Sequence, residues 1–355
     1  MTLTTHEPAP STTSMSMPVG GPNADHGTEG RTHIPTATSI SDGLIPAGPT
    51  TPLTHTVPRE YVHRLAHSEV FLTSIRTTAP DTYALTAQWP RQHTFYSTYP
   101  HHHDPLILCE TLRQSLPLIA HTAYDLPLSH KLGWEHLHYT LNPDALLKSN
   151  TPADIHISAV CTDIKRRRGQ LISLTIHFTI THNGVHLATA HTRYHCHHPS
   201  LYTRLRQGRT NPTQTTLTAP PPTPPINPRI IHRTLPQDVT LTATPQPHQH
   251  QLRIDPTHPI LFDHPLDHAP GMLLIEATRQ ATQTHHIHPQ LPTSLTINFH
   301  RYVEYDSPTI ITTHSTPDDL TSPLDPRTHT TTLTATQNDA TAYSAVLTTQ
   351  TLLEG

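Results

Sequence analysis

The chain has 355 residues, a length that suggests two domains of ordinary size, each large enough to bury a core. Its 22 lysines and arginines against 26 aspartates and glutamates give a formal charge of −4, which provides no basic field to bind nucleic acid through phosphates. The N-terminal residues have neither a cationic start nor an apolar core, and no later run reaches the roughly 20 apolar residues of a membrane span. We therefore expect a cytoplasmic protein with no nucleic-acid partner and no membrane span.

Cysteine and histidine do not point to a metal site. The three cysteines form no CxxC pair and leave one unmatched, which predicts neither a disulfide framework nor a cysteine-based zinc site. The 34 histidines occur in every region of the chain, and this diffuse enrichment lowers the value of the histidines at 101–103 and 248–250 as metal ligands. We therefore predict no metal.

Composition divides the chain into four parts. Residues 1–57 carry Ser, Thr, Pro, Gly and His with little apolar periodicity, which predicts a disordered tail. Clustered prolines in 208–228 predict an extended, semi-rigid linker. Two folded domains, at 58–207 and 229–355, remain.

The two folded domains are similar to each other. VHRLAHSEVFL at 62–72 aligns without gaps with IHRTLPQDVTL at 231–241, and ILCETLRQS at 107–115 aligns with LLIEATRQA at 273–281. The two matches occur in the same order with nearly equal spacing, which predicts a duplicated domain. The aligned polar pairs are His63/His232, Arg64/Arg233, Glu69/Asp238, Glu110/Glu276, Arg113/Arg279 and Gln114/Gln280.

Each domain is predicted to contain one long helix. In the first, Asp104 can cap a helix that begins at Pro105, and apolar residues at helical spacing predict that this helix is mostly buried. Pro117 lies inside it and should kink it or end it early. In the second domain, a Pro-Gly pair opens a helix predicted over 270–285.

The stretch after each helix is predicted to form sheet. Apolar residues alternate over 172–180, and the Asn-Gly pair at 183–184 predicts a tight turn into a strand over 185–195. Strands at 333–336 and 343–347 repeat this scheme in the second domain. We therefore predict an α+β double hotdog, in which two tandem hotdog domains each wrap an antiparallel sheet around a long central helix.

The recurring Glu, Arg and Gln are candidates for a functional site. Residues at i, i+3 and i+4 project from one side of a helix, where such a trio can simply stabilise the helix by a few tenths of a kcal/mol. A charged pair on a buried helix is costly unless it has a task, and the trio recurs while its neighbours have diverged, so a functional role is favoured. The residues concerned are Glu110, Arg113 and Gln114 in the first domain and Glu276, Arg279 and Gln280 in the second.

A histidine also recurs just before each helix. His102 and His268 each lie eight residues before the glutamate. A histidine there lies beside free backbone amides and the positive end of the helix, which suits it to polarise a thioester carbonyl or stabilise an oxyanion. His103 and His264 are alternatives for this role.

Three segments resemble a known family. QWPRQHTFY at 88–96, HDPLILCETLRQ at 103–114 and DHAPGMLLIEATRQA at 267–281 are similar to the signature segments of the A-factor biosynthesis hotdog family, the AfsA-like γ-butyrolactone synthases of actinomycetes. The resemblance spans about residues 59–350. It implies an acyltransferase that moves a β-ketoacyl chain from an acyl carrier protein or acyl-CoA to dihydroxyacetone phosphate, on the way to γ-butyrolactone signals that control antibiotic production. It implies no cofactor beyond the phosphopantetheine of the carrier.

Such a reaction needs a base, oxyanion donors and a cation for the phosphate. Glu276, its pKa raised by burial, is the candidate base, and Arg279 is the candidate phosphate ligand. His268 and the amides near Gly271 would stabilise the oxyanion. We favour this set because PGM at 270–272 gives an unobstructed start to the helix. The pseudo-symmetric catalytic set is Glu110 and Arg113, and the further substrate-binding candidates are Gln280, Gln114, His102 and His264.

Two other features have plainer interpretations. The basic run at 165–169 predicts a solvated hairpin turn, with docking of an acidic carrier protein as the alternative. Cys109 precedes Glu110 and raises the idea of an acyl-enzyme, but it aligns with Ile275, so a buried apolar role is favoured. The chain has no GxSxG elbow and no Gly-rich phosphate loop.

Two rival functions remain open from the sequence. A hotdog thioesterase or dehydratase is the first, since the second helix also resembles the dehydratase pattern of histidine, PG and glutamate, with a shorter spacing if His264 is the counterpart. A non-catalytic acyl-binding protein is the second. A double hotdog already contains an internal pseudo-dimer, so the oligomeric state stays open.

Overall fold

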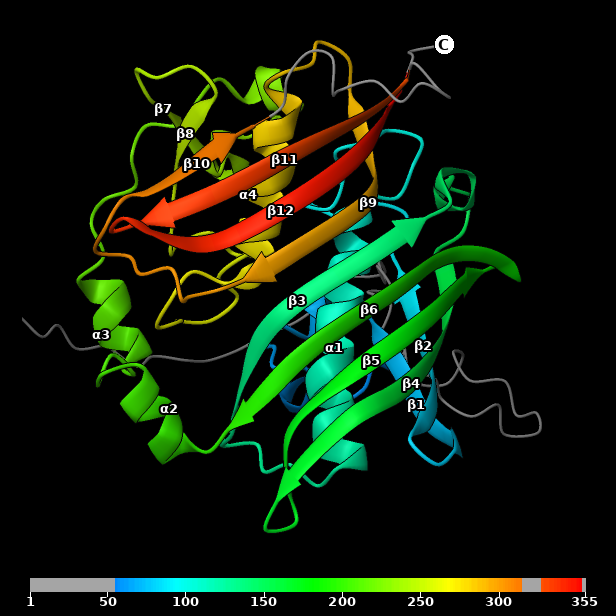
Figure 1. Ribbon diagram of the computed structural model, residues 1–355. Helices are drawn as coiled ribbons and strands as arrows, with labels where there is room; N and C mark the ends of the chain where they lie inside the picture. The colour runs from blue at the N-terminus through cyan, green and yellow to red at the C-terminus, as the bar shows by residue number, and fades with distance from the viewer. Residues whose placement is uncertain (1–54, 315–326, 353–355) are drawn as a thin grey trace, which may run out of the picture. The chain divides into compact units, whose positions relative to one another are not determined.

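The sheet is the largest feature of the computed structural model, which describes residues 55–314 and 327–352. Twelve strands from these residues form one antiparallel sheet in the order β1-β2-β4-β5-β6-β3-β9-β12-β11-β10-β8-β7 (Figure 1). Their bounds are β1 (Leu72–Ala79), β2 (Thr82–Trp89), β3 (Lys131–Leu141), β4 (Ala153–Arg167), β5 (Gln170–His182), β6 (Val185–His197), β7 (Leu241–Ala243), β8 (Gln249–Leu252), β9 (Gln290–Phe299), β10 (Thr309–Thr313), β11 (Thr328–Gln337) and β12 (Ala340–Thr351).

The strand order shows the duplication. The sequence of strands from β1 to β3 is repeated in reverse from β9 to β7, so the two halves meet where β3 pairs with β9. There Leu137 lies opposite Ile297 and Tyr139 opposite Leu295, and all four side chains are buried. Burying apolar pairs across this junction removes two open sheet edges and joins the halves into one core. The predicted double hotdog is confirmed.

The two long helices, α1 (Pro105–Ala123) and α4 (Gly271–Gln283), lie on one face of the sheet (Figure 1). Most positions of both are buried all round, as expected of helices enclosed by a sheet. Two short helices, α2 (Pro199–Leu205) and α3 (Pro212–Leu217), connect the halves. The remaining short segments are 3-10 turns: η1 (Arg59–Val62), η2 (His67–Glu69), η3 (Pro143–Leu146), η4 (Pro228–Ile231) and η5 (Pro236–Asp238).

Helix α1 begins as predicted but ends later. Asp104 accepts a hydrogen bond from the Leu106 amide at 3.0 Å, and Pro105 takes the first helical position. The helix does not stop at Pro117 but continues to Ala123. The three residues after the proline are at most 1% exposed. Their burial outweighs the cost of the missing N–H, about 3 kcal/mol, so the expectation of an early end is wrong.

The predicted hairpin turns are confirmed. Asn183 and Gly184 have φ of 51° and 75° and connect β5 to β6. In the second half, Asn338 and Asp339 have φ of 51° and 59° between β11 and β12. Two successive residues with positive φ match the right-handed twist of the flanking strands, which explains why Asn, Asp and Gly occupy these turns.

Two predicted segments differ from the structure in part. Residues 1–54 of the predicted tail lie outside the described residues, as do 315–326 and 353–355 of the second domain. Val57, however, is buried, and its amide donates to the Leu72 carbonyl. Within the predicted extended linker 208–228, α3 forms because Asn211 caps it through the Gln214 amide at 3.0 Å, a local signal that the proline-rich composition concealed.

Candidate active site

The recurring glutamate of the second half is fully buried in a polar cluster. Glu276 accepts hydrogen bonds from Arg279 at 2.7 and 2.8 Å and from Gln280 at 2.6 Å. Arg233, just after η4, adds two more at 2.7 and 3.0 Å. The carboxylate therefore accepts five hydrogen bonds: two from Arg279, two from Arg233 and one from Gln280.

The first half repeats this cluster contact by contact. Glu110 is also fully buried and accepts hydrogen bonds from Arg113 at 2.8 Å twice and from Gln114 at 2.7 Å. Arg64 binds the same carboxylate through Nε at 3.0 Å and Nη2 at 2.6 Å. The structure thus brings together the predicted trio in each half.

Sequence reasoning left out the fourth member of each cluster. Arg64 and Arg233 match in the alignment of the two halves, which was the available signal, but they lie 46 and 43 residues before their glutamates. Their position depends on the turn at the end of η1 and η4, where His63 and His232 both adopt a left-handed backbone. Both arginines also reach across the halves, since Arg64 donates to the Ile260 carbonyl and Arg233 to the Phe95 carbonyl.

The electrostatics of the clusters overturn one expectation. Burial alone would raise the pKa of Glu276, but the charges of Arg233 and Arg279 and their hydrogen bonds outweigh it and lower the pKa to about 2. The pKa of Glu110 falls to about 2 for the same reason. A carboxylate of such low basicity is a weak general base, so the expected upward shift is wrong. Arg279 is likewise engaged by its glutamate and is almost fully buried.

The two glutamines serve the backbone around each cluster. Gln114 accepts from the Phe71 amide and donates to the Glu69 carbonyl. Gln280 accepts from the Thr240 amide and donates to the Asp238 carbonyl. These contacts join each long helix to the segment that leads into the first strand of the same half. The recurring glutamine, four residues after the glutamate, therefore has a structural role in both halves.

A second cluster lies just before α4, around His268. Its Nδ1 is 2.6 Å from Oδ1 of Asp267, and its side chain is 26% exposed while that of Asp267 is 8% exposed. Tyr202 of α2 places its hydroxyl 2.9 Å from both carboxylate oxygens of Asp267. A carboxylate at Nδ1 holds the ring proton on that nitrogen, so Nε2 presents a lone pair.

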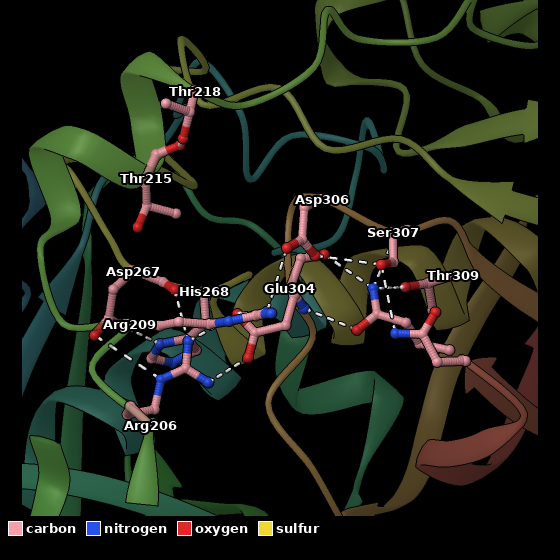
Figure 2. A network of polar contacts seen from close by, with 12 residues as sticks. Arg206, Arg209, Thr215, Thr218, Asp267, His268, Glu304, Asp306, Ser307 and Thr309 are labelled. Atoms are coloured by element: carbon pink, nitrogen blue, oxygen red, sulfur yellow. Dashed lines mark hydrogen bonds and ion pairs between the residues drawn. The ribbon is translucent and has the colours of Figure 1, made fainter. Parts of the chain in front are cut away.

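The cluster extends to the segment after β9, as Figure 2 shows. Arg206 binds both carboxylate oxygens of Glu304 and donates from Nη2 to the Asp267 carbonyl at 2.7 Å. The Arg209 side chain is 53% exposed, and its Nη1 lies 3.3 Å from Oδ2 of Asp306 and 3.7 Å from Oε2 of Glu304. A cleft of about 250 Å³ opens here, lined by Arg209, Asn211, Gln214, Thr215, Thr218, Glu304, Tyr305 and Asp306 among others.

The start of α4 has uncapped amides and a close aromatic neighbour. The N-cap residue, Pro270, offers no side-chain hydrogen bond, and within the described residues no acceptor binds the amides of Gly271 and Met272. A Cβ at Gly271 would lie 2.9 Å from Cε3 of Trp134, so only glycine fits here without a shift. The start that we expected to be unobstructed is therefore partly walled by an indole.

The start of α1 is closed by comparison. Asp104 binds the Leu106 amide there and also accepts from Thr98. His102, which aligns with His268, is half-buried and pairs through its backbone with Leu147. In the described residues its ring has no carboxylate partner comparable to Asp267. His103 is buried beside Trp89 instead of facing solvent.

The remaining candidates lie elsewhere. His264 contacts Asp263, which accepts hydrogen bonds from the Leu65 and Ala66 amides of the first half. Within the described ranges, no hydrogen bond or ion pair links His264 to the dyad of Asp267 and His268. Cys109 is buried, and burial raises its pKa, which supports the structural role over an acyl-enzyme.

The basic run and the question of a membrane span can also be compared with the structure. Residues 165–168 are exposed at the hairpin between β4 and β5, whose turn places Arg168 and Gly169 at positive φ. Among the described residues, no helix is long and apolar enough to cross a membrane.

The comparisons with known proteins identify the family of the chain. The model of the A-factor biosynthesis hotdog domain matches two segments, 47–198 and 213–352. A 2-oxo-3-(phosphooxy)propyl 3-oxoalkanoate synthase of Streptomyces virginiae is 40% identical over 258 residues, covering 72% of this chain and 86% of that protein. Synthases of the same name from Streptomyces coelicolor and Streptomyces griseus are 34% and 33% identical, covering 71% and 82% of this chain and 80% and 95% of their own lengths. The predicted family and the predicted class of enzyme are confirmed: the chain belongs to the A-factor biosynthesis hotdog family.

Proposed function

We propose that this protein transfers a 3-oxoacyl chain from a thioester to the free hydroxyl of dihydroxyacetone phosphate, forming a 2-oxo-3-(phosphooxy)propyl 3-oxoalkanoate. The product named for relatives at 33–40% identity supports this reaction. An acyl carrier protein or coenzyme A would carry the thioester. The observation that carries the site is the dyad of His268 and Asp267 beside the uncapped start of α4.

In the proposed mechanism, His268 is the general base. Its Nε2 takes the proton of the acceptor hydroxyl while the hydroxyl oxygen attacks the thioester carbonyl carbon. The negative charge moves to the carbonyl oxygen, which the Gly271 and Met272 amides stabilise at the positive end of α4. The intermediate then expels the thiolate, and the imidazolium of His268 returns the proton to sulfur. Asp267 stabilises the imidazolium that forms between the two steps.

The acceptor phosphate needs a cation that is accessible from solvent. The Arg279 guanidinium is buried and bound to Glu276, so we assign the phosphate to Arg209, which is exposed and lines the cleft; Figure 2 shows its contacts. Glu304 is already neutralised by Arg206, and the Asp306 side chain is 61% exposed, so water weakens its ion pair with Arg209. The amide and hydroxyl side chains of the cleft are suited to bind the polar end of the acceptor. The clusters around Glu110 and Glu276 act as structural supports in this scheme.

The test is a product analysis with the whole protein. A 3-oxoacyl thioester and dihydroxyacetone phosphate are supplied together, and mass spectrometry is used to follow the phosphorylated ester. Dihydroxyacetone without phosphate is the matched acceptor, and it should react far more slowly. Free 3-oxo acid without ester would identify a thioesterase, an enoyl product would identify a dehydratase, and no turnover with several chain lengths would identify an acyl-binding protein. Each of these three results would overturn the proposal.

A further inference from the structure

The dyad before α4 is held by side chains from the segment between the two halves. Helix α2 follows β6, the last strand of the first half, and it carries Tyr202 and, at its C-cap, Arg206. Both side chains are buried. The Tyr202 hydroxyl is a hydrogen-bond donor to a carboxylate and lies 2.9 Å from both Oδ1 and Oδ2 of Asp267. A hydroxyl so placed orients the carboxylate that orients His268.

Arg206 contacts both the backbone and the side chain of Asp267. Nη2 donates to the Asp267 carbonyl, and Nε lies buried 4.0 Å from Oδ2 with no hydrogen-bond partner within the described residues. Its guanidinium carbon is 4.4 Å from the centroid of the Tyr302 ring, and that ring lies 4.7 Å from the ring of His268. Glu304 binds the outer edge of the guanidinium and completes a chain of contacts from the cleft to the dyad (Figure 2).

We propose that Tyr202 and Arg206 are positioning residues that set the basicity of His268 through Asp267. This inference rests on the proposed role of His268 as general base. A carboxylate that already accepts from a hydroxyl and faces a guanidinium attracts the imidazolium less strongly. Removing either contact should strengthen the attraction between Asp267 and the imidazolium, and the pH dependence of activity measures that change.

The charge state of Asp267 agrees with this arrangement. Burial alone would raise its pKa, but hydrogen bonds from His268 and Tyr202 and the charges of His268 and Arg206 lower it. The carboxylate is therefore ionised throughout the neutral range. The groups that face the dyad are Tyr202 and Arg206 from α2, and Tyr302, Glu304 and Tyr305 from the segment after β9.

The three polar neighbours predict pH shifts of opposite sign. Tyr202→Phe removes a hydrogen-bond donor from Asp267, and Arg206→Gln removes a positive charge near it. Each change should move the acid limb of the kcat/KM profile to higher pH, by up to about one pH unit. Glu304→Gln leaves the Arg206 charge unneutralised, so it should lower the acid limb. A purely structural role would reduce activity equally at every pH and leave the limb in place.

The experiment measures kcat/KM for ester formation against pH in the full-length protein and these three variants. Tyr194→Phe is the matched control, because its buried hydroxyl donates to the Leu116 carbonyl in the first half, and its limb should match the wild type. A wild type that forms no ester would overturn the proposed function, and a fully active His268→Ala would overturn the role of the dyad. If both of those hold but none of the three limbs moves, or all move in the same direction, only the present inference is overturned. Thermal unfolding identifies any variant that has lost its fold. If Arg206→Gln does not fold, Arg206→Lys is measured in its place; because it keeps the positive charge, its acid limb should lie close to that of the wild type.

Discussion

The starts of α1 and α4 are equivalent by sequence alignment but differ in chemistry. At α1, the Asp104 carboxylate binds the Leu106 amide in the first turn of the helix. At α4, Pro270 leaves the corresponding amides uncapped, and a histidine with a carboxylate partner lies beside them. The first amides of α4 can therefore still bind an electron-rich oxygen, whereas the start of α1 already carries a negative charge that repels one.

The middles of the same helices have stayed alike. Glu110 and Glu276 each bind two arginines and one glutamine with nearly the same distances. The comparison shows that recurrence after duplication marks what both halves need in order to fold. The proposed site lies where the halves differ, namely at the dyad of His268 in the second half, where the first half has the capping carboxylate of Asp104 instead.

The largest expected effect is a difference in kcat between variants of the two aligned histidines, His268 and His102. His268→Ala should lower kcat by about 10²- to 10⁴-fold, the usual contribution of a general base. His102→Ala should leave kcat within about a factor of two, because His102 lies outside the proposed site and precedes a helix whose start is capped by Asp104. Steady-state ester formation by both variants measures this difference. Equal losses would place catalytic function in both halves.

The next effect concerns stability, and here the halves should behave alike. Glu276→Ala leaves Arg233 and Arg279 buried without a carboxylate, and Glu110→Ala does the same to Arg64 and Arg113. Each change should lower the free energy of unfolding by about 3–5 kcal/mol. Urea denaturation at neutral pH gives the values. Arg113 is 21% exposed and Arg279 only 5%, so the loss should be the smaller one in the first half.

Acid should act on the same pair of clusters. Both glutamates have a folded-state pKa of about 2 against an ordinary value of 4.5. Their stabilisation is therefore complete above pH 4.5 and is lost as the pH falls toward 2. Urea midpoints measured between pH 6 and pH 3 should decline, and in the double variant Glu110→Gln with Glu276→Gln the decline should be shallower. An unchanged slope in that variant would assign the acid sensitivity to other carboxylates.

The smallest expected effect concerns the cap at the start of α1, which α4 lacks. Asp104→Ala removes the cap of α1 and should cost about 1 kcal/mol of stability. Ester formation should be unaffected at saturating substrate, because the change lies outside the proposed site. Thermal unfolding and activity measured on one preparation separate the two effects. A loss of activity beyond the loss of folded protein would implicate the first half in the reaction.

Much of the fold could be predicted from local signals. The cap at Asp104, the paired positive-φ turns and the alternating strands each depend on a few neighbouring residues, so they can be read along the chain. The continuation of α1 past Pro117 could not be, because it depends on burial by the surrounding sheet. The helix α3 was missed for a different reason, since the composition of the whole segment outweighed the short signal of Asn211 and Pro212.

For the site, the sequence by itself determined which residues recur, and hence the family, the double hotdog and the carboxylate and guanidinium trio. It could not determine the charge of Glu276, because that charge depends on Arg233, which is far away along the chain and reaches the carboxylate only through the left-handed turn at His232. Nor could it pair His268 with Tyr202 and Arg206, which come from the segment between the halves. Electrostatic interactions depend on distance in space, so only the tertiary structure decided which arginines surround Glu276 and which carboxylate and hydroxyl accompany His268.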